Sequence, residues 1–183
     1  MNFHKGLMML LLAAVFAMPA FAQEEAKAEN WLEKRFGKEL VNAKGEKVAT
    51  ATLKGKTVGI YFSAHWCPPC RKLTPQLVTL RDAVAKDNFE IVFISSDKDE
   101  EAMKGYMKET KMGWLAVPFN AKQRNAVQKE YSVSGIPTLI ILDQDGKTIM
   151  KEIGYGGETI DKVKKVLNNR KKAQAEKTEN AEK

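Results

Sequence analysis

A strand that runs directly into a helix most constrains the fold of this 183-residue chain. Residues 57–62 form a near-continuous apolar run, which is typical of a strand covered on both of its faces. A helix is predicted next, because two prolines are followed by apolar residues at helical spacing, namely Leu73, Leu77, Leu80 and Val84. The only two cysteines of the chain, Cys67 and Cys70, lie at this junction between strand and helix.

Strands and helices alternate along the rest of the chain. The predicted strands cover residues 40–41, 47–52, 57–62, 90–95, 137–142 and 148–153, with a tight turn at 143–146 before the last one. Besides the helix after the cysteines, the predicted helices cover residues 97–111, 120–131 and 158–169. This order predicts an α/β domain with a central mixed sheet and helices on both faces.

Residues 1–22 have the pattern of a secretory signal peptide. Lys5 precedes an apolar run over residues 7–18, and the segment ends in a small-x-small cleavage site at residues 20–22. The apolar run is shorter than the ~20 residues that a helix needs to span a bilayer, so an uncleaved membrane anchor is the lesser alternative. We therefore expect a periplasmic or secreted protein.

The remaining residues are enough for a single domain. Residues 23–36 are charged and rich in alanine, which predicts a linker or an N-terminal helix, and the domain proper is expected over residues 37–169. Residues 170–183 lack apolar periodicity and predict a charged, disordered tail. The net charge of +7 comes from basic residues interspersed with acids, so we expect no nucleic-acid partner; we also expect a monomer.

The spacing of Cys67 and Cys70 favours redox chemistry over a structural disulfide. A bridge across two residues closes a tiny loop and removes little entropy from the unfolded chain, so it would stabilise the fold only slightly. A domain of this size also buries roughly two thirds of its unfolded surface without disulfides. An adjacent pair instead suits thiol–disulfide exchange, in which one thiolate attacks a partner and the other releases it. We predict a thiol–disulfide oxidoreductase.

The start of the helix assigns different roles to the two thiols. Cys67 is expected at the helix N-cap, where unpaired amides and the helix dipole favour a thiolate, so it is the predicted nucleophile. Cys70 lies one turn inside the helix and is the predicted resolving thiol. Pro69 has no N–H, which leaves mainly the Cys70 amide to bind a Cys67 thiolate. This weaker stabilisation of the thiolate predicts a moderately reducing protein and not a strong oxidant.

Two motifs resemble the thioredoxin family. The run Trp-Cys-Pro-Pro-Cys at residues 66–70 follows a buried strand, and Gly-Ile-Pro-Thr at residues 135–138 comes about seventy residues later. This arrangement is similar to the thioredoxin fold. Ser-Ser-Asp-Lys-Asp-Glu-Glu at residues 95–101 and Trp-Leu-Ala-Val-Pro-Phe at residues 114–119 narrow the resemblance to the tryparedoxin and nucleoredoxin branch, here as an exported bacterial-type member. Gly113 departs from that branch, which usually has proline before this tryptophan.

The resemblance implies a substrate-binding surface around Cys67. It implies a cis peptide bond before Pro137, which would place the backbone of Ile136 beside Cys67, where it can pair with an extended substrate segment. The other implied substrate contacts are Pro137 itself, Trp66, Pro68 and Trp114. Packing inside the protein is the alternative for both tryptophans. Tyr61 stands where many thioredoxins carry a buried acid, so a water or this phenol would have to move the proton of the resolving thiol.

We therefore expect a reductase that passes electrons from the Cys67/Cys70 dithiol to protein disulfides. An oxidising compartment supplies no reducing equivalents, so a membrane-linked or soluble dithiol donor is implied, and no cofactor is expected. The same site run backwards would be a disulfide oxidant or an isomerase. A second class of function is the binding of Cu(I) by Cys67, Cys70 and His65.

Overall fold

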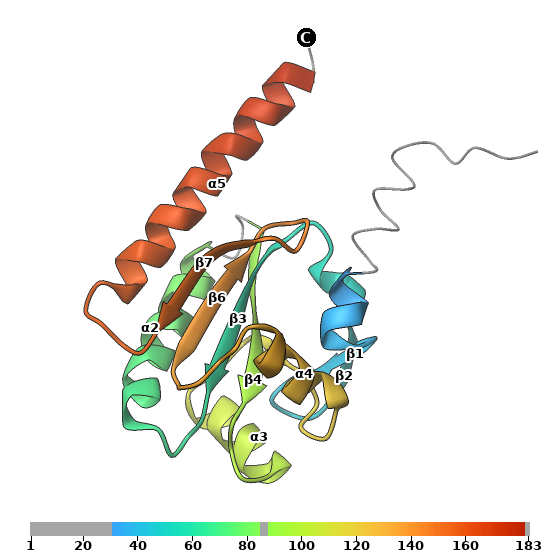
Figure 1. Cartoon of the computed structure of the whole chain (residues 1–183), viewed down its shortest axis with the longest axis vertical. Helices are drawn as coiled ribbons and strands as arrows, with labels where there is room; N and C mark the ends of the chain where they lie inside the picture. Colours follow the sequence, from blue (N-terminus) through green and yellow to red (C-terminus); the bar gives the residue numbers. More distant parts are fainter. Residues whose placement is uncertain (1–30, 85–87, 182–183) are drawn as a thin grey trace, which may run out of the picture.

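The computed structural model describes residues 31–84 and 88–181 (Figure 1). The strands are β1 (Glu39–Val41), β2 (Lys47–Ala49), β3 (Thr57–Ser63), β4 (Phe89–Ser95), β5 (Leu115–Ala116), β6 (Thr138–Leu142) and β7 (Thr148–Ile153). The helices are η1 (Thr50–Leu53), α2 (Pro68–Val84), α3 (Glu100–Glu109), α4 (Lys122–Glu130) and α5 (Thr159–Ala181), and residues 31–36 are also helical. The predicted signal peptide over residues 1–22 lies outside the described residues.

The seven strands form one mixed sheet in the order β2-β1-β5-β4-β3-β6-β7. Strand β3 pairs in parallel with β4 and antiparallel with β6, with Phe62 opposite Thr138. Because antiparallel strands run in opposite directions, the end of β3 lies beside the start of β6. The segment that follows β3 therefore meets the segment that precedes β6.

Side chains of the central strands alternate between the two faces of the sheet and build two apolar clusters. Tyr61 of β3 belongs to one cluster, together with Leu77 of α2, Val163 of α5 and residues of α3. The next residue, Phe62, belongs to the other cluster, together with Val127 of α4 and residues of the helical segment 31–36. Helices thus cover both faces of the sheet (Figure 1), which confirms the predicted α/β architecture.

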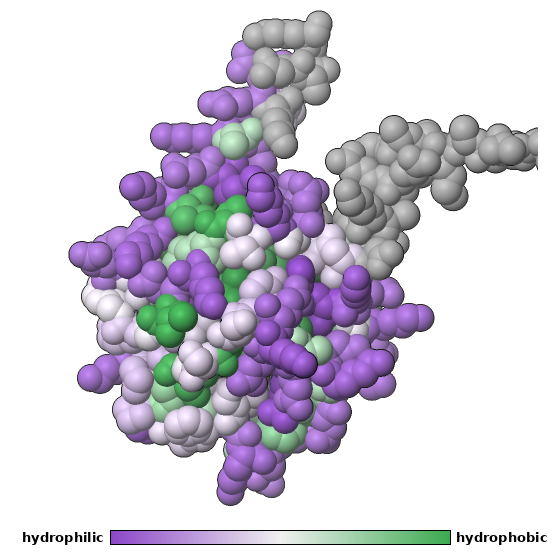
Figure 2. Space-filling view, in the orientation of Figure 1, coloured by the Kyte–Doolittle hydropathy of each residue, from purple (hydrophilic) through white to green (hydrophobic). Residues whose placement is uncertain are grey.

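Helix α5 is longer than predicted. Val163 and Leu167 pack its first turns against the domain, and the helix then continues to Ala181, projecting past the sheet (Figure 1). The prediction of a disordered tail is wrong for residues 170–181, because their lysines, alanines and glutamates favour a helix that packing has already nucleated. Figure 2 shows hydrophilic residues over the projecting part. Neither α5 nor any other helix of the described residues is long and apolar enough to cross a membrane.

Candidate active site

The two cysteines lie at the N-terminus of α2. Cys67 directly precedes Pro68, the first residue of the helix, and Cys70 lies within the first turn. Their sulfur atoms form a disulfide, and their Cα atoms are 5.2 Å apart. The Cys70 amide donates a hydrogen bond to the Cys67 sulfur at 3.3 Å, whereas Pro69 has no N–H to donate. The Cys67 sulfur is therefore an acceptor at this helix N-terminus.

The loop that precedes β6 approaches the Cys67 sulfur. The peptide bond between Ile136 and Pro137 is cis, as the resemblance implied. The Ile136 carbonyl oxygen lies 3.7 Å from the Cys67 sulfur. The Gly154 amide donates to the Pro137 carbonyl oxygen at 2.7 Å, so the end of β7 helps to hold this loop in place.

A groove with a volume of about 440 Å³ opens beside the disulfide. Cys67 lines it together with three of the expected substrate contacts, Trp66, Pro68 and Ile136. The Trp66 side chain is 64% exposed, and its indole N–H donates to the Ser96 carbonyl oxygen at 3.0 Å, which fixes the orientation of the ring. Pro137 is buried and does not line the groove. The disulfide therefore borders an open, largely apolar surface.

The expectation that Trp114 contacts the substrate is wrong. Its side chain is 1% exposed and packs in the core, with its ring edge-on to the Tyr61 ring at a centroid distance of 6.4 Å. Trp114 directly precedes β5, whose pairing with β4 holds this segment against the core. Gly113, which stands where the branch usually has proline, leaves room for the Arg81 guanidinium group. A Cβ atom at this position would lie 3.2 Å from Nη1 of Arg81.

A buried carboxylate that no sequence motif assigned to the site fixes the segment before the cysteines. Asp97 is 6% exposed, and its oxygens accept hydrogen bonds from the His65 amide at 2.8 Å and from the Ser95 hydroxyl at 2.8 Å. Arg124 donates to the Ser95 carbonyl oxygen at 3.1 Å. These contacts connect the residues just before Cys67 to the end of β4. An acidic residue two positions after a predicted buried strand was the only sequence signal for this role.

Four hydroxyl groups form a buried cluster beside the first turns of α2: those of Tyr61, Ser63, Thr74 and Tyr106. The Thr74 hydroxyl donates to the Cys70 carbonyl oxygen at 2.9 Å, and it lies within hydrogen-bonding distance of both phenols. Ser63 Oγ lies 3.2 Å from the Tyr106 hydroxyl. When both phenols donate to Thr74 and Ser63 donates to Tyr106, every hydroxyl proton of the cluster has an acceptor.

Burial keeps the two phenols of this hydroxyl cluster neutral. Removal from water raises the pKa of Tyr61 and the pKa of Tyr106 above the ordinary value of 10.0. The Tyr61 hydroxyl lies 3.3 Å from the Cys70 carbonyl oxygen, so it faces the backbone of the resolving cysteine. A neutral phenol is a hydrogen-bond donor and a poor base. Sequence patterns missed both Thr74, which is not part of the apolar spacing of α2, and Tyr106, which helical spacing marks only as core.

His65 lies at the surface next to α3. Its Nε2 atom is 3.0 Å from a carboxylate oxygen of Glu109, and its ring packs against the Tyr106 ring at a centroid distance of 5.4 Å. The structure thus pairs His65 with a carboxylate of α3. Within residues 31–84 and 88–181, no group of three or more His, Cys, Asp or Glu side chains is arranged to hold a metal ion.

Known proteins of one family match this chain. A family model described as thioredoxin-like matches residues 55–148. Human nucleoredoxin is 45% identical over 116 residues, which are 62% of this chain and 26% of that protein. Probable nucleoredoxin 1 from Arabidopsis thaliana is 46% identical over 110 residues, which are 59% of this chain and 19% of that protein. The chain therefore spans about a quarter or less of the length of these curated relatives.

Solved structures match over most of their length. Tryparedoxin I from Crithidia fasciculata is 39% identical with a TM-score of 0.60, and the match covers 66% of this chain and 85% of that one. Thioredoxin from Wuchereria bancrofti is 42% identical with a TM-score of 0.59, and the match covers 62% of this chain and 81% of that one. The chain thus belongs to the thioredoxin-like family and carries the adjacent cysteine pair of a thiol–disulfide oxidoreductase.

Proposed function

We propose that this protein reduces disulfide bonds of other proteins with its Cys67/Cys70 dithiol. The observation that carries the proposal is the asymmetry of the pair. Cys67 lines the groove and is 3% exposed, whereas Cys70 is 0% exposed and does not line the groove. A disulfide of a partner protein can therefore reach Cys67, and the release of the partner falls to Cys70.

The reaction takes two exchange steps. The Cys67 thiolate attacks one sulfur of the partner disulfide, a Cys67–partner disulfide forms, and the other partner sulfur leaves as a thiolate. The Cys70 thiolate then attacks the Cys67 sulfur, the Cys67–Cys70 disulfide closes, and the first partner sulfur leaves as a second thiolate. Two electrons have passed from the dithiol to the partner. A donor dithiol restores Cys67 and Cys70 by the same steps in reverse.

The arrangement at the helix N-terminus supports the reducing direction. The Cys70 amide donates to the Cys67 sulfur, and Pro69 removes a second backbone donor from this turn. A thiolate with fewer donors is less stabilised, so its pKa falls less and the reduced form of the protein gains less stability. A protein of this kind gives up electrons more readily than a strong oxidant does.

We propose that the reaction takes place in the periplasm or outside the cell, because residues 1–22 have the pattern of a cleaved signal peptide. An oxidising compartment implies a membrane-linked or soluble dithiol protein as the electron donor. The protein would act as a monomer on partner proteins that carry accessible disulfides.

Trapping of partners tests this function. In a reduced Cys70→Ala variant the nucleophile remains and the release step is lost. Partners should therefore stay bound to Cys67 through a disulfide that an added reductant cleaves. The matched Cys67→Ala variant should trap none, and the wild-type protein should reduce insulin when dithiothreitol is the donor. Trapping by Cys67→Ala alone would reverse the two roles. A wild-type dithiol that reduces neither insulin nor any other protein disulfide would contradict the proposal.

A further inference from the structure

The groove beside Cys67 continues into a second hollow. This second hollow, which we call the far end of the groove, has a volume of about 530 Å³. Gln128, Val133 and Ser134 line both hollows, so the two are continuous. The groove therefore extends from Cys67 along residues 132–136, which lie in the connection from α4 to β6.

The chemistry of the lining changes along the groove. The part next to Cys67 is lined by apolar side chains, among them Trp66, Pro68 and Ile136. The far end is lined by Val133 and by five residues with polar side chains, namely Asn125, Gln128, Lys129, Ser132 and Ser134. Among the described residues that line either hollow, Lys129 carries the one ionised side chain. The far end is therefore suited to a polar or anionic group.

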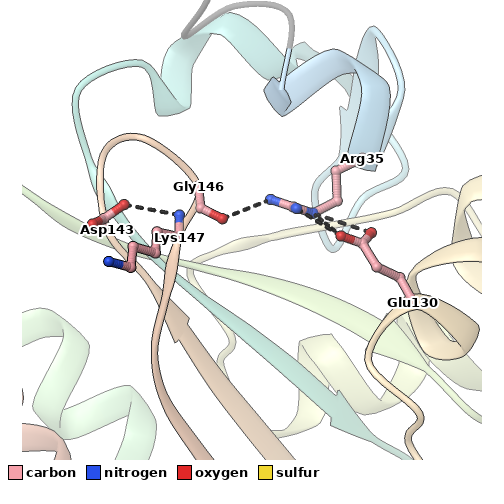
Figure 3. Close-up of polar contacts among 5 residues, drawn as sticks. All are labelled: Arg35, Glu130, Asp143, Gly146 and Lys147. Atoms are coloured by element: carbon pink, nitrogen blue, oxygen red, sulfur yellow. Dashed lines mark hydrogen bonds and ion pairs between the residues drawn. The ribbon is translucent and has the colours of Figure 1, made fainter.

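A second ammonium group lies beside the turn that ends α4. Lys151 of β7 donates to the Tyr131 carbonyl oxygen at 2.8 Å, next to Ser132 in the sequence. The carboxylate of Glu130, which follows Lys129, is bound by Arg35 at 2.7 Å, and Figure 3 shows it turned toward that guanidinium group. This carboxylate is therefore already paired with a cation, and Lys129 is the charged side chain that lines the far end of the groove.

The spacing along the groove sets which residue of a substrate would reach this charge. Ser132 lies four residues before Ile136, and the chain turns between them, with Ser132 at a φ of 48°, so this connection is no longer than four extended residues. An extended segment that pairs with the Ile136 backbone would thus reach the far end within about four residues of its cysteine. Given the proposed function, on which this inference rests, we propose that the far end binds an aspartate or glutamate of the substrate within that distance. The preferred substrates are disulfide-bonded segments with such an acidic residue.

Synthetic peptides can measure this preference. Each peptide would carry one cysteine as a mixed disulfide with thionitrobenzoate and either a Glu-Glu or a Lys-Lys pair four residues away, on its N-terminal or C-terminal side. The Cys67 thiolate of pre-reduced protein attacks the peptide sulfur and releases thionitrobenzoate, whose absorbance reports the rate; Cys70 then closes the disulfide and frees the peptide thiol. Single turnovers at increasing peptide concentration separate the maximal rate from the half-saturating concentration.

Glutamate peptides should react about two- to fivefold faster than lysine peptides at low concentration in at least one placement, the size expected for an exposed ion pair. The difference should lie in the half-saturating concentration and should shrink at high ionic strength. Lys129→Glu should abolish or reverse the preference. The matched variant Lys122→Glu changes the net charge equally on an exposed residue of α4 that does not line the groove, so the preference should remain.

Equal rates for glutamate and lysine peptides in both placements would overturn this inference, as would a preference that survives Lys129→Glu. A preference that Lys122→Glu removes equally well would overturn it too, since net charge would then explain the effect. In each of these cases insulin reduction would still support the proposed function. Failure with every peptide and with insulin would instead remove the proposed function itself.

Discussion

The Asp97 carboxylate accepts a hydrogen bond from the backbone amide of His65 at 2.8 Å, across 32 residues of sequence. The two residues follow β4 and β3, which are parallel neighbours with Ser63 opposite Ser95. Parallel strands end at the same edge of a sheet, so the segments that follow them lie together there. A buried carboxylate at this edge therefore positions the backbone two residues before Cys67.

Removal of this carboxylate should loosen the site. Asp97→Ala leaves the His65 amide and the Ser95 hydroxyl without their acceptor, so the free energy of unfolding should fall by about 1–3 kcal/mol and insulin reduction should slow. Urea unfolding and a turbidity assay measure the two effects. Asp97→Asn keeps an oxygen for the His65 amide and should lose less of both. Equal losses in the two variants would show that the hydrogen bond to His65 is unimportant.

Loss of the Thr74 hydroxyl should destabilise the fold by a similar amount. Thr74→Val preserves the shape of the side chain but takes one hydrogen-bond partner from each of Tyr61 and Tyr106 and the side-chain donor from the Cys70 carbonyl, so the free energy of unfolding should drop by about 1–3 kcal/mol. Thr74→Ser keeps the hydroxyl and serves as the control. Denaturant midpoints that are the same for both variants would contradict the role assigned to this hydroxyl.

Stability should fall in alkaline solution. Burial raises the pKa of Tyr61 and of Tyr106 above 10.0, so the folded protein keeps phenol protons that the unfolded chain releases as the pH rises through 10. The unfolded state then binds fewer protons, and the free energy of unfolding decreases with pH in this range. Urea unfolding between pH 8 and 11 measures the decline. Tyr61→Phe and Tyr106→Phe should each flatten it, and an unchanged slope in both would contradict this account.

The two tryptophans near the site should respond oppositely to truncation. Trp66→Ala removes an exposed ring from the groove, so it should weaken the reduction of protein substrates severalfold while unfolding changes little. Trp114→Ala empties a core position and should cost about 3–5 kcal/mol of the free energy of unfolding. Thermal unfolding and substrate titrations on both variants distinguish the roles. A stable Trp114→Ala protein with impaired substrate reduction would restore Trp114 to the binding surface.

Local patterns were enough to predict the central elements. The apolar runs of β3, β4 and β6, the tight turn before β7 and the helical spacing in α2 all appear in the structure, and with them the position of Cys67 at a helix N-terminus. The three apolar strands and α2 are visible in the sequence because their own side chains form the core. The short strand β5 escaped prediction, since two residues show no periodicity. Thr50–Leu53 forms a 3-10 helix, whereas the predicted strand continued to residue 52. The Lys54 amide donates a backbone hydrogen bond to the Ala51 carbonyl oxygen, which closes this helical turn.

Contacts between distant segments account for the other differences. An apolar side chain such as Trp114 suits a protein core and a binding surface equally well. The pairing of β5 with β4 places Trp114 in the core. Asp97 and Thr74 serve the site through partners that lie in other elements, which no sequence spacing records. The helix over residues 170–181 has the composition of a solvated tail, and the packing of the preceding turns of α5 makes it helical.

Because β3 pairs antiparallel with β6, the selection of substrates at Cys67 depends on residues that the ribosome adds much later. A nascent or proteolysed chain that stops before residue 128 contains both thiols, but it lacks the Ile136 carbonyl and the side of the groove that residues 128–136 provide. Such a fragment has the thiols but not the surface that would select their partners. The reactive sulfur and the surface that selects its partners are therefore encoded in separate parts of the gene.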